Sequence, residues 1–322
     1  MAKPLLPEVD RLIRYQEGIV RRGQLIAAGM PPSAIRRRLV SGEWRRLGEG
    51  VYATFTGKPV REAKLWAVVL LAGPGALLSH ETAAELHGFA KEASGKIHVS
   101  VPVTRDPARK FPMRGVVIHR CSVMRPYRVQ GPWILPQTGL ESTAVDLITA
   151  AESFDDAYGW ICRATKNHLT VPVLLRQEIA GRAKIRWRAW LDEALTDAES
   201  GINSALELRY VRGVERAHSL PTAQRQAKEH ADAKVMYLDN LYADYQLCVE
   251  LDGLAYHPPE ERQKDADRDN AIIAATNTRI MRFNWVSATE KRCKTAQLVT
   301  DALRNNGWQG KPRPCRRSCP VT

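Results

Sequence analysis

Carboxylates in the C-terminal third of the sequence have the types and spacing of a metal-dependent hydrolytic site. Asp239 ends an apolar run that begins at Val235, and Glu250 lies inside the run Leu247-Cys-Val-Glu-Leu. An unpaired carboxylate in an apolar strand is costly to bury, and a bound cation removes that cost. Asp252 lies two residues after Glu250, on the same strand face. Oxygen ligands from neighbouring strands suit Mg²⁺ or Mn²⁺, so we expect a divalent metal site at Asp239 and Glu250.

The elements that must position these acids follow from the surrounding pattern. A helix that starts at Ser204 carries Glu207, strands cover Val235 to Asp239 and Leu247 to Leu251, and Arg279 to Phe283 forms a later strand. A charged helix from about residue 260 and a closing helix from about 288 to 305 complete the region. The predicted order is helix, strand, strand, helix, strand, helix.

The spacing of these motifs resembles a known nuclease family. Asp239-x10-Glu250-Leu-Asp252-Gly253, His257, Arg268-Asp-Asn270 and Arg279-Ile-Met-Arg-Phe283 resemble the endonuclease domain that is similar to the very-short-patch-repair enzyme. That domain belongs to the PD-(D/E)xK superfamily. The resemblance covers residues 199–308 and implies a restriction-endonuclease-like core of the αβββαβ type.

The resemblance also implies roles for single residues. Asp239 and Glu250 would bind the metal, and Glu207 corresponds to the acid on the leading helix. His257 would act as general acid or base, and Arg268 would stabilise charge on the phosphate. The superfamily places a Lys where this chain has Asp252. The implied activity is Mg²⁺- or Mn²⁺-dependent hydrolysis of phosphodiester bonds in DNA, with RNA as an open alternative.

Several of these residues also have simple structural explanations. Ser204-x-x-Glu207 is a helix capping box, and Asp252-Gly253 is a favourable turn pair. His257 precedes two prolines and fits a loop. Glu250 and Asp239 have no comparably simple structural explanation.

The first 57 residues predict a winged helix-turn-helix. Helices are expected over 8–17, from 22 to 29 and from an N-cap at Ser33 to Gly42, with a hairpin over 44–53. In such domains the second helix of the turn lies in the DNA major groove and the hairpin contacts phosphate. The candidate DNA-binding residues are Arg36, Arg37, Arg38, Arg45 and Arg46.

The segment from Gly23-Gln-Leu-Ile to Gly50-Val-Tyr resembles the N-terminal domain of AbiEi-type antitoxins. That resemblance implies operator binding and autoregulation. The alternative is that Arg36, Arg37 and Arg38 form a solvated helix face.

Residues 58–198 predict a mixed α+β connector domain. Strands are expected over 96–103 and 115–121, with helices on both sides in the sequence, and the segment weakly resembles the region after the winged helix in AbiEi-like proteins. His80, Glu81 and His87 lack the spacing of a zinc-protease helix, so no site is expected there. His98 and His119 are expected to be structural.

The charge distribution separates the polyanion-binding parts from the rest. The 322 residues carry a net charge of +13; residues 1–60 hold eleven basic and five acidic residues, whereas 199–308 hold fifteen and sixteen. The tail, 309–322, holds four basic residues and is expected to be disordered. Cys315 and Cys319 have the spacing of half a zinc site, but no matching second pair of Cys or His is apparent nearby.

Taken together, these patterns predict a multidomain α/β protein of the α+β kind in a reducing cytoplasm, without a membrane span. The leading interpretation is a DNA-binding protein whose C-terminal domain is a metal-dependent endonuclease, in phage defence or mobile-element biology. The alternative is a non-catalytic AbiEi-type antitoxin and transcriptional regulator that uses the nuclease fold for binding. DNA is the expected partner, and a toxin protein and a second copy of the chain are further candidates.

Overall fold

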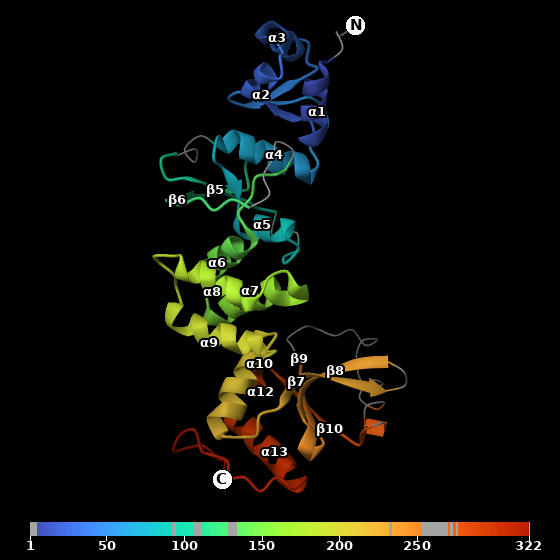
Figure 1. Ribbon diagram of the computed structural model, residues 1–322, viewed down its shortest axis with the longest axis vertical. Helices are drawn as coiled ribbons and strands as arrows, with labels where there is room; N and C mark the ends of the chain where they lie inside the picture. Colours follow the sequence, from blue (N-terminus) through green and yellow to red (C-terminus); the bar gives the residue numbers. More distant parts are fainter. Residues whose placement is uncertain are drawn as a thin grey trace. The chain divides into compact units, whose positions relative to one another are not determined.

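The computed structural model describes residues 5–91, 95–105, 111–127, 134–231, 234–252, 270, 273–274 and 276–321 (Figure 1). The chain divides into two compact units. Unit 1 comprises Met1–Ala151 and Arg163–Arg186, and unit 2 comprises Glu152–Cys162 and Trp187–Thr322. In the part of the chain that the structure describes, no helix has both the length and the apolarity needed to cross a bilayer.

Unit 1 begins with three helices and a small antiparallel sheet, drawn in blue in Figure 1. The elements are α1 (Pro7–Tyr15), β1 (Ile19–Arg21), α2 (Arg22–Ala27), α3 (Pro32–Val40), β2 (Arg45–Gly48) and β3 (Val51–Ala53), and the strand order is β1-β3-β2. Helix α3 starts one residue before the expected Ser33 cap. Pro31 is its N-cap and Pro32 its first residue, because the fixed φ of proline suits the first helical turn.

Both faces of the small sheet are covered. Val20 and Tyr52 point to one face and pack with Leu25, Ile35 and other residues of α1 to α3. The alternate residues point to the opposite face and pack against the following helix, α4 (Arg61–Ala72). The alternation follows from the two-residue period of a strand.

Helix α4 is buried on two sides. Its residues Ala63, Trp66 and Ala67 join the core of the β1-β3-β2 sheet, and Leu65 and Val68 join a second core farther along the chain. Its contact with the sheet is close at one point, because a Cβ atom on Gly48 would lie 2.3 Å from Leu71 Cδ2. A larger residue at position 48 would therefore force the Leu71 side chain or β2 to move.

The second core of unit 1 surrounds a three-stranded sheet with the order β4-β5-β6. Its elements are β4 (Leu77–Leu78), α5 (His80–Leu86), β5 (Ile97–Pro102), β6 (Val116–Cys121), α6 (Leu140–Ala150) and α8 (Pro172–Ala180). Helix α7 (Phe154–Thr165) belongs to unit 2 up to Cys162 and to unit 1 from Arg163. Strand β4 is antiparallel to β5, and β5 is parallel to β6. The mixture of helices and small sheets that the sequence predicts is confirmed.

Unit 2 contains a four-stranded sheet with the order β10-β9-β8-β7. Its elements are α9 (Arg188–Glu199), α10 (Ala205–Tyr210), β7 (Gln224–Ala231), β8 (Lys234–Tyr242), β9 (Leu247–Asp252), β10 (Arg279–Asn284), α12 (Trp285–Ala288) and α13 (Arg292–Asn305). Strands β7, β8 and β9 form an antiparallel meander, and β9 is parallel to β10. Sequence analysis missed β7, because its residues Gln-Arg-Gln-Ala-Lys-Glu-His-Ala have no apolar alternation and it lies at the sheet edge. Most of the helix expected from residue 260 lies outside the described residues.

The tail does not match the expectation of disorder. Residues 309–321 follow a defined path, Val321 is buried, and the backbone N–H of Arg313 donates to the carbonyl of His218. The composition of the tail predicts disorder because it is rich in Pro and Arg and poor in apolar residues. The residues that hold it in place, such as Arg313 and Val321, are too few and too widely spaced to form a pattern.

Candidate functional site

Helix α3 presents two arginines to solvent. Arg36 and Arg37 are exposed, whereas Ile35 on the same helix is 2% exposed and packs in the core formed by α1 to α3 and the small sheet. Two adjacent guanidinium groups on a solvated helix face can contact neighbouring phosphates or base edges. These two residues have the exposure that the expected DNA-binding role requires.

Arg38 has a different environment from the one expected. Its side chain is buried, pairs with Glu43, and lies 5.5 Å from the centre of the Trp44 ring. Its carbonyl accepts from Trp44 N and from Ser41 Oγ. Because the helix turns by about 100° per residue, Arg38 faces the hairpin and not the solvent, and we correct its assignment to a structural one.

The hairpin supplies further exposed positive charge. Arg45 and Arg46 on β2 are exposed, and Arg45 donates to the carbonyl of Gly57 at 3.1 Å. Beside the hairpin lies a cavity of about 880 Å³. Its charged lining residues are Arg21, Arg22, Arg46, Arg105 and Glu49. The cavity is therefore strongly positive, with a single carboxylate among its charged groups.

In unit 2, Asp239 and Glu250 lie side by side on β8 and β9. Asn240 of β8 is paired with Val249 of β9 in antiparallel register, so the next two facing positions are Asp239 and Glu250. Asp239 N lies 3.4 Å from Glu250 Oε1, and Leu251 N donates to Asp239 Oδ2 at 3.0 Å. Glu250 is 4% exposed. The structure thus places these two carboxylates together, as the sequence predicts.

Glu207 lies at the start of α10 in a capping box. Ser204 Oγ accepts from the backbone N–H of Glu207, and the Glu207 carboxylate accepts from Asn203 N and from Ser204 Oγ. Burial, with a smaller contribution from the negative charge of Asp239, raises the pKa of Glu207 to about 7 although these hydrogen bonds act in the opposite direction. The electrostatic effect of Asp239 shows that this third acid is near the pair on the sheet.

Asp252 forms an ion pair with Arg282 on the neighbouring strand. Arg282 Nη1 lies 2.7 Å from Asp252 Oδ1, and Arg282 is in register with Glu250 on the parallel strand β9. Residues in register point to the same sheet face. A guanidinium group from β10 therefore lies on the face that carries Glu250. His257 and Arg268 lie outside the described residues.

The acids do not form a converging set of three ligands. Among the described residues, three or more potential metal ligands approach within 4.8 Å at two places, and neither includes Glu207, Asp239 or Glu250. One group is His80, His98 and His119, and the other is His218, Cys293, Cys315 and Cys319. Sequence analysis missed the histidine group and found only the Cys315 and Cys319 half of the second group, because the other members are far away in the sequence.

The three histidines of unit 1 are stacked and uncharged. His80 is the first residue of α5, and its ring is 3.6 Å from that of His119 at an interplanar angle of 12°. His98 Nδ1 lies 3.0 Å from His119 Nε2. Burial, together with the neighbouring imidazoles, lowers the pKa of His80 to about 3 and that of His119 to about 4. Parallel rings do not direct their nitrogens to one point, so this group favours a neutral stack over a metal site.

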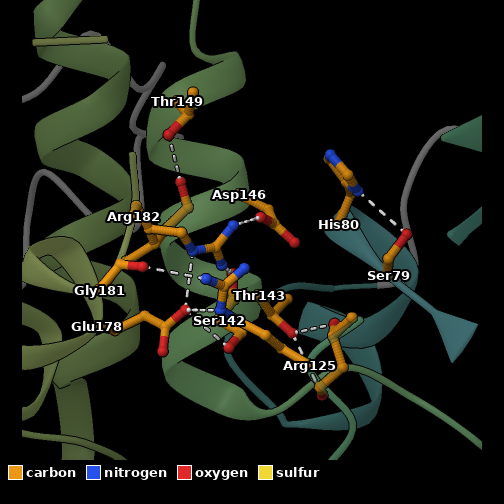
Figure 2. A network of polar contacts seen from close by, with 12 residues as sticks. Ser79, His80, Arg125, Ser142, Thr143, Asp146, Thr149, Glu178, Gly181 and Arg182 are labelled. Carbon is orange, nitrogen blue, oxygen red and sulfur yellow. Dashed lines mark hydrogen bonds and ion pairs between the residues drawn. The ribbon is translucent and has the colours of Figure 1, made fainter. Parts of the chain in front are cut away.

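Close to this stack, half-buried charges join α6 to α8 and to the residues that follow it (Figure 2). Arg182 donates to Asp146 Oδ1 at 2.6 Å and to Glu178 Oε1 at 2.8 Å, and Arg125 pairs with the same Glu178 at 3.1 Å. Burial raises the pKa of Asp146 although Arg182 acts in the opposite direction. These contacts link α6 to α8 and indicate a structural role for the network.

Two AbiEi family models match most of unit 1. Residues 7–54 match the family described as "Transcriptional regulator, AbiEi antitoxin", and residues 74–196 match "AbiEi antitoxin C-terminal domain". This chain contains both AbiEi antitoxin domains. The N-terminal AbiEi match holds α1 to β3, and the C-terminal match runs from the start of the β4-β5-β6 region into α9. Helix α4 lies between the two AbiEi matches, and the acids of unit 2 lie beyond both.

Other comparisons add little to the AbiEi matches. A search of curated proteins finds no match. A structure described as the RV2827C protein from Mycobacterium tuberculosis is 19% identical over 65% of this chain and 82% of that chain, with a TM-score of 0.38.

Proposed function

We propose that this protein is a DNA-binding transcriptional regulator of the antitoxin type, and that its first six elements form a winged helix-turn-helix. The observation that carries the proposal is the pair of exposed arginines on α3, within a segment that matches a transcriptional-regulator family. In this arrangement α3 enters the major groove. The β2–β3 hairpin, with Arg45 and Arg46, then contacts the adjacent phosphates.

The test is DNA binding by Arg37→Ala. Losing one phosphate contact weakens binding and lowers the slope of log affinity against log salt by about 1. Fluorescence anisotropy on duplex DNA from the region upstream of its own gene, across a salt series, measures both. Arg14→Ala is the matched control, because Arg14 pairs with Asp10 and its charge is already compensated.

Arg38→Ala separates a structural effect from a binding effect. Because Arg38 is buried against Trp44 and Glu43, this variant should lower the free energy of unfolding by about 1–3 kcal/mol. Its salt slope should stay that of the wild type under conditions in which it is folded. An unchanged slope for Arg37→Ala would contradict the proposed interface.

The antitoxin family also suggests a protein partner. We infer that a toxin protein binds this chain, as the description of the matched family implies. Co-expression with a toxin encoded beside it should give a complex that stays intact through size-exclusion chromatography. Separate elution of the two proteins at micromolar concentration would oppose this inference.

A second candidate function is metal-dependent hydrolysis of phosphodiester bonds in unit 2. It is favoured by Glu250, a carboxylate that is 4% exposed beside Asp239 and near Glu207. The donors to Asp239 are the backbone N–H of Leu251 and the amide of Gln226, neutral groups that do not cancel its charge. Asp239 and Glu250 offer the carboxylate oxygens that a hard divalent cation such as Mg²⁺ or Mn²⁺ prefers, and one or two carboxylates with several waters are enough for such an ion.

In this candidate site the acids would hold the ion, and the ion would supply a water of lowered pKa. Asp239 and Glu250 are the ligands, and Glu207 with its raised pKa can hold or release a proton near neutral pH. Arg282 brings positive charge to the sheet face where the superfamily has a Lys. Its ion pair with Asp252 would hold the guanidinium on this face, where its positive charge would favour a bound phosphate.

The test is cleavage of single- and double-stranded DNA and of RNA with Mg²⁺ or Mn²⁺. Wild-type protein should cut at least one substrate, and Glu250→Gln should lose the activity. Glu290→Gln, which changes an exposed acid of the same unit, is the control and should keep it. Wild-type protein that cuts none of these substrates would refute the hydrolysis proposal, and the transcriptional-regulator proposal would then stand alone.

A further inference from the structure

We propose that His218, Cys293, Cys315 and Cys319 form a structural zinc site in unit 2. The potential ligand atoms of these four side chains all lie within 4.8 Å of one another. Three thiolates and one imidazole are a set typical of structural zinc, which is bound in a closed tetrahedron. The site supplies the second pair of ligands that the spacing of Cys315 and Cys319 requires.

His218 has the geometry of a ligand. Its ring is fully buried, and Nδ1 lies 2.8 Å from the carbonyl of Val214. That bond makes Nδ1 the donor and leaves the lone pair of Nε2 free, and Nε2 is buried without a hydrogen-bond partner. Histidines that bind metals use this arrangement, in which a backbone carbonyl fixes the tautomer. A buried nitrogen without a partner is unfavourable, and a bound ion would remove that cost.

The sulfur atoms have a separation close to that of a metal site. Cys293 Sγ lies 3.5 Å from Cys315 Sγ, and all six cysteines of the chain are free thiols. A Zn–S bond of about 2.3 Å puts two sulfurs of a tetrahedron about 3.8 Å apart, whereas a disulfide needs about 2.05 Å. The pair is thus closer to a shared ion than to a disulfide.

The surrounding backbone and charges favour this set. Cys293 lies in the first turn of α13, where the helix dipole stabilises a thiolate. Zinc with three thiolates keeps one net negative charge, and Arg316 and Arg317 lie between the two tail cysteines. The N–H of Arg313 binds the carbonyl of His218, so the tail is already held at the site. Zinc would therefore fasten the tail to α13 and to the segment that ends in His218.

The first measurement is metal content. Full-length protein purified under reducing conditions without added chelator should contain one zinc per chain by atomic spectroscopy. Exchange with Co²⁺ should give the intense visible absorption of tetrahedral cobalt with thiolate ligands. Cys319→Ser should lose most of the zinc and change the cobalt spectrum, and Cys121→Ser, in unit 1, should leave both unchanged.

His218 is buried, so its loss can also disturb folding. His218→Cys keeps a ligand at this position and should retain zinc in a four-thiolate set, whereas His218→Ala should lose it. Folded wild-type protein that takes up neither zinc nor cobalt would overturn the proposal. So would a Cys293–Cys315 disulfide in protein prepared without an oxidant, or zinc retained at full stoichiometry by Cys319→Ser.

Discussion

Neighbouring residues of one type can lie in opposite environments in this protein. Arg37 is exposed on α3, and Arg38, one residue later, is buried between Glu43 and Trp44. The sequence predicts a basic helix face, but which arginine turns inward depends on where the hairpin packs. The same holds for Asp252, whose partner Arg282 comes from a strand about thirty residues away in the chain, beyond the reach of local patterns.

Glu207 gives a prediction at the residue scale. Its pKa is raised from 4.5 to about 7, so the folded state binds its proton more tightly than the unfolded state. Stability from this group is therefore present at low pH and is lost as the pH rises from about 4.5 to about 7. Glu207→Gln keeps the capping-box acceptor and should become more stable than wild type above pH 7, by at most roughly 3 kcal/mol.

The measurement is urea unfolding of both proteins at pH 5 and pH 8. The stability difference between variant and wild type should grow between the two values. Glu290→Gln serves as the control for charge removal at an exposed site of the same unit. A difference that is constant with pH would show that Glu207 ionises normally.

At the scale of elements, the sequence predicts most helices and strands of unit 1 correctly. The strands expected over 96–103 and 115–121 appear as β5 and β6, because apolar residues alternate along β5 and β6 opens with a run of β-branched residues. Strand β7 was missed, since its polar residues belong to an edge strand whose partner, and not its own composition, keeps it extended. The histidine and cysteine groups could not be predicted, because the fold and not the spacing joins their members.

The contact between β2 and α4 gives a prediction for elements. Gly48→Val places carbon atoms within 2.3 Å of Leu71 Cδ2, so β2 must move away from α4. We expect the free energy of unfolding of unit 1 to fall by about 1–3 kcal/mol, as for overpacked cores. Thermal unfolding followed by circular dichroism measures it. Gly57→Val is the control, because a Cβ atom there meets no other atom within 4 Å.

At the scale of the whole molecule, two units with separate cores should unfold in two transitions. The histidine stack belongs to unit 1 alone. Because the pKa values of His80 and His119 are lowered from 6.5 to about 3 and about 4, the unfolded state takes up protons first on acidification. The stack therefore makes unit 1 less stable as the pH falls from about 6.5 to about 4, by up to about 1.4 kcal/mol per pH unit for each histidine.

Calorimetry of wild type and His119→Asn between pH 7 and pH 4 tests this. The transition of unit 1 in the variant should shift less with pH than in the wild type. His168→Asn, which changes an exposed histidine of unit 1, should behave as the wild type. Equal pH dependence in all three proteins would rule out the stack as the acid-sensitive part.

Helix α4 lies between the two matched AbiEi segments and contributes to the cores of both. This limits how such proteins can be recombined. A chimera joined at residue 57 would combine one parent's sheet with the other parent's α4, and the two surfaces would not have been selected to fit. A crossover after Ala72 would keep α4 with the first sheet but separate Leu65 and Val68 from the second core, so neither end of α4 is a neutral crossover point. Chimeras should therefore be most stable when both cores that α4 joins come from one parent.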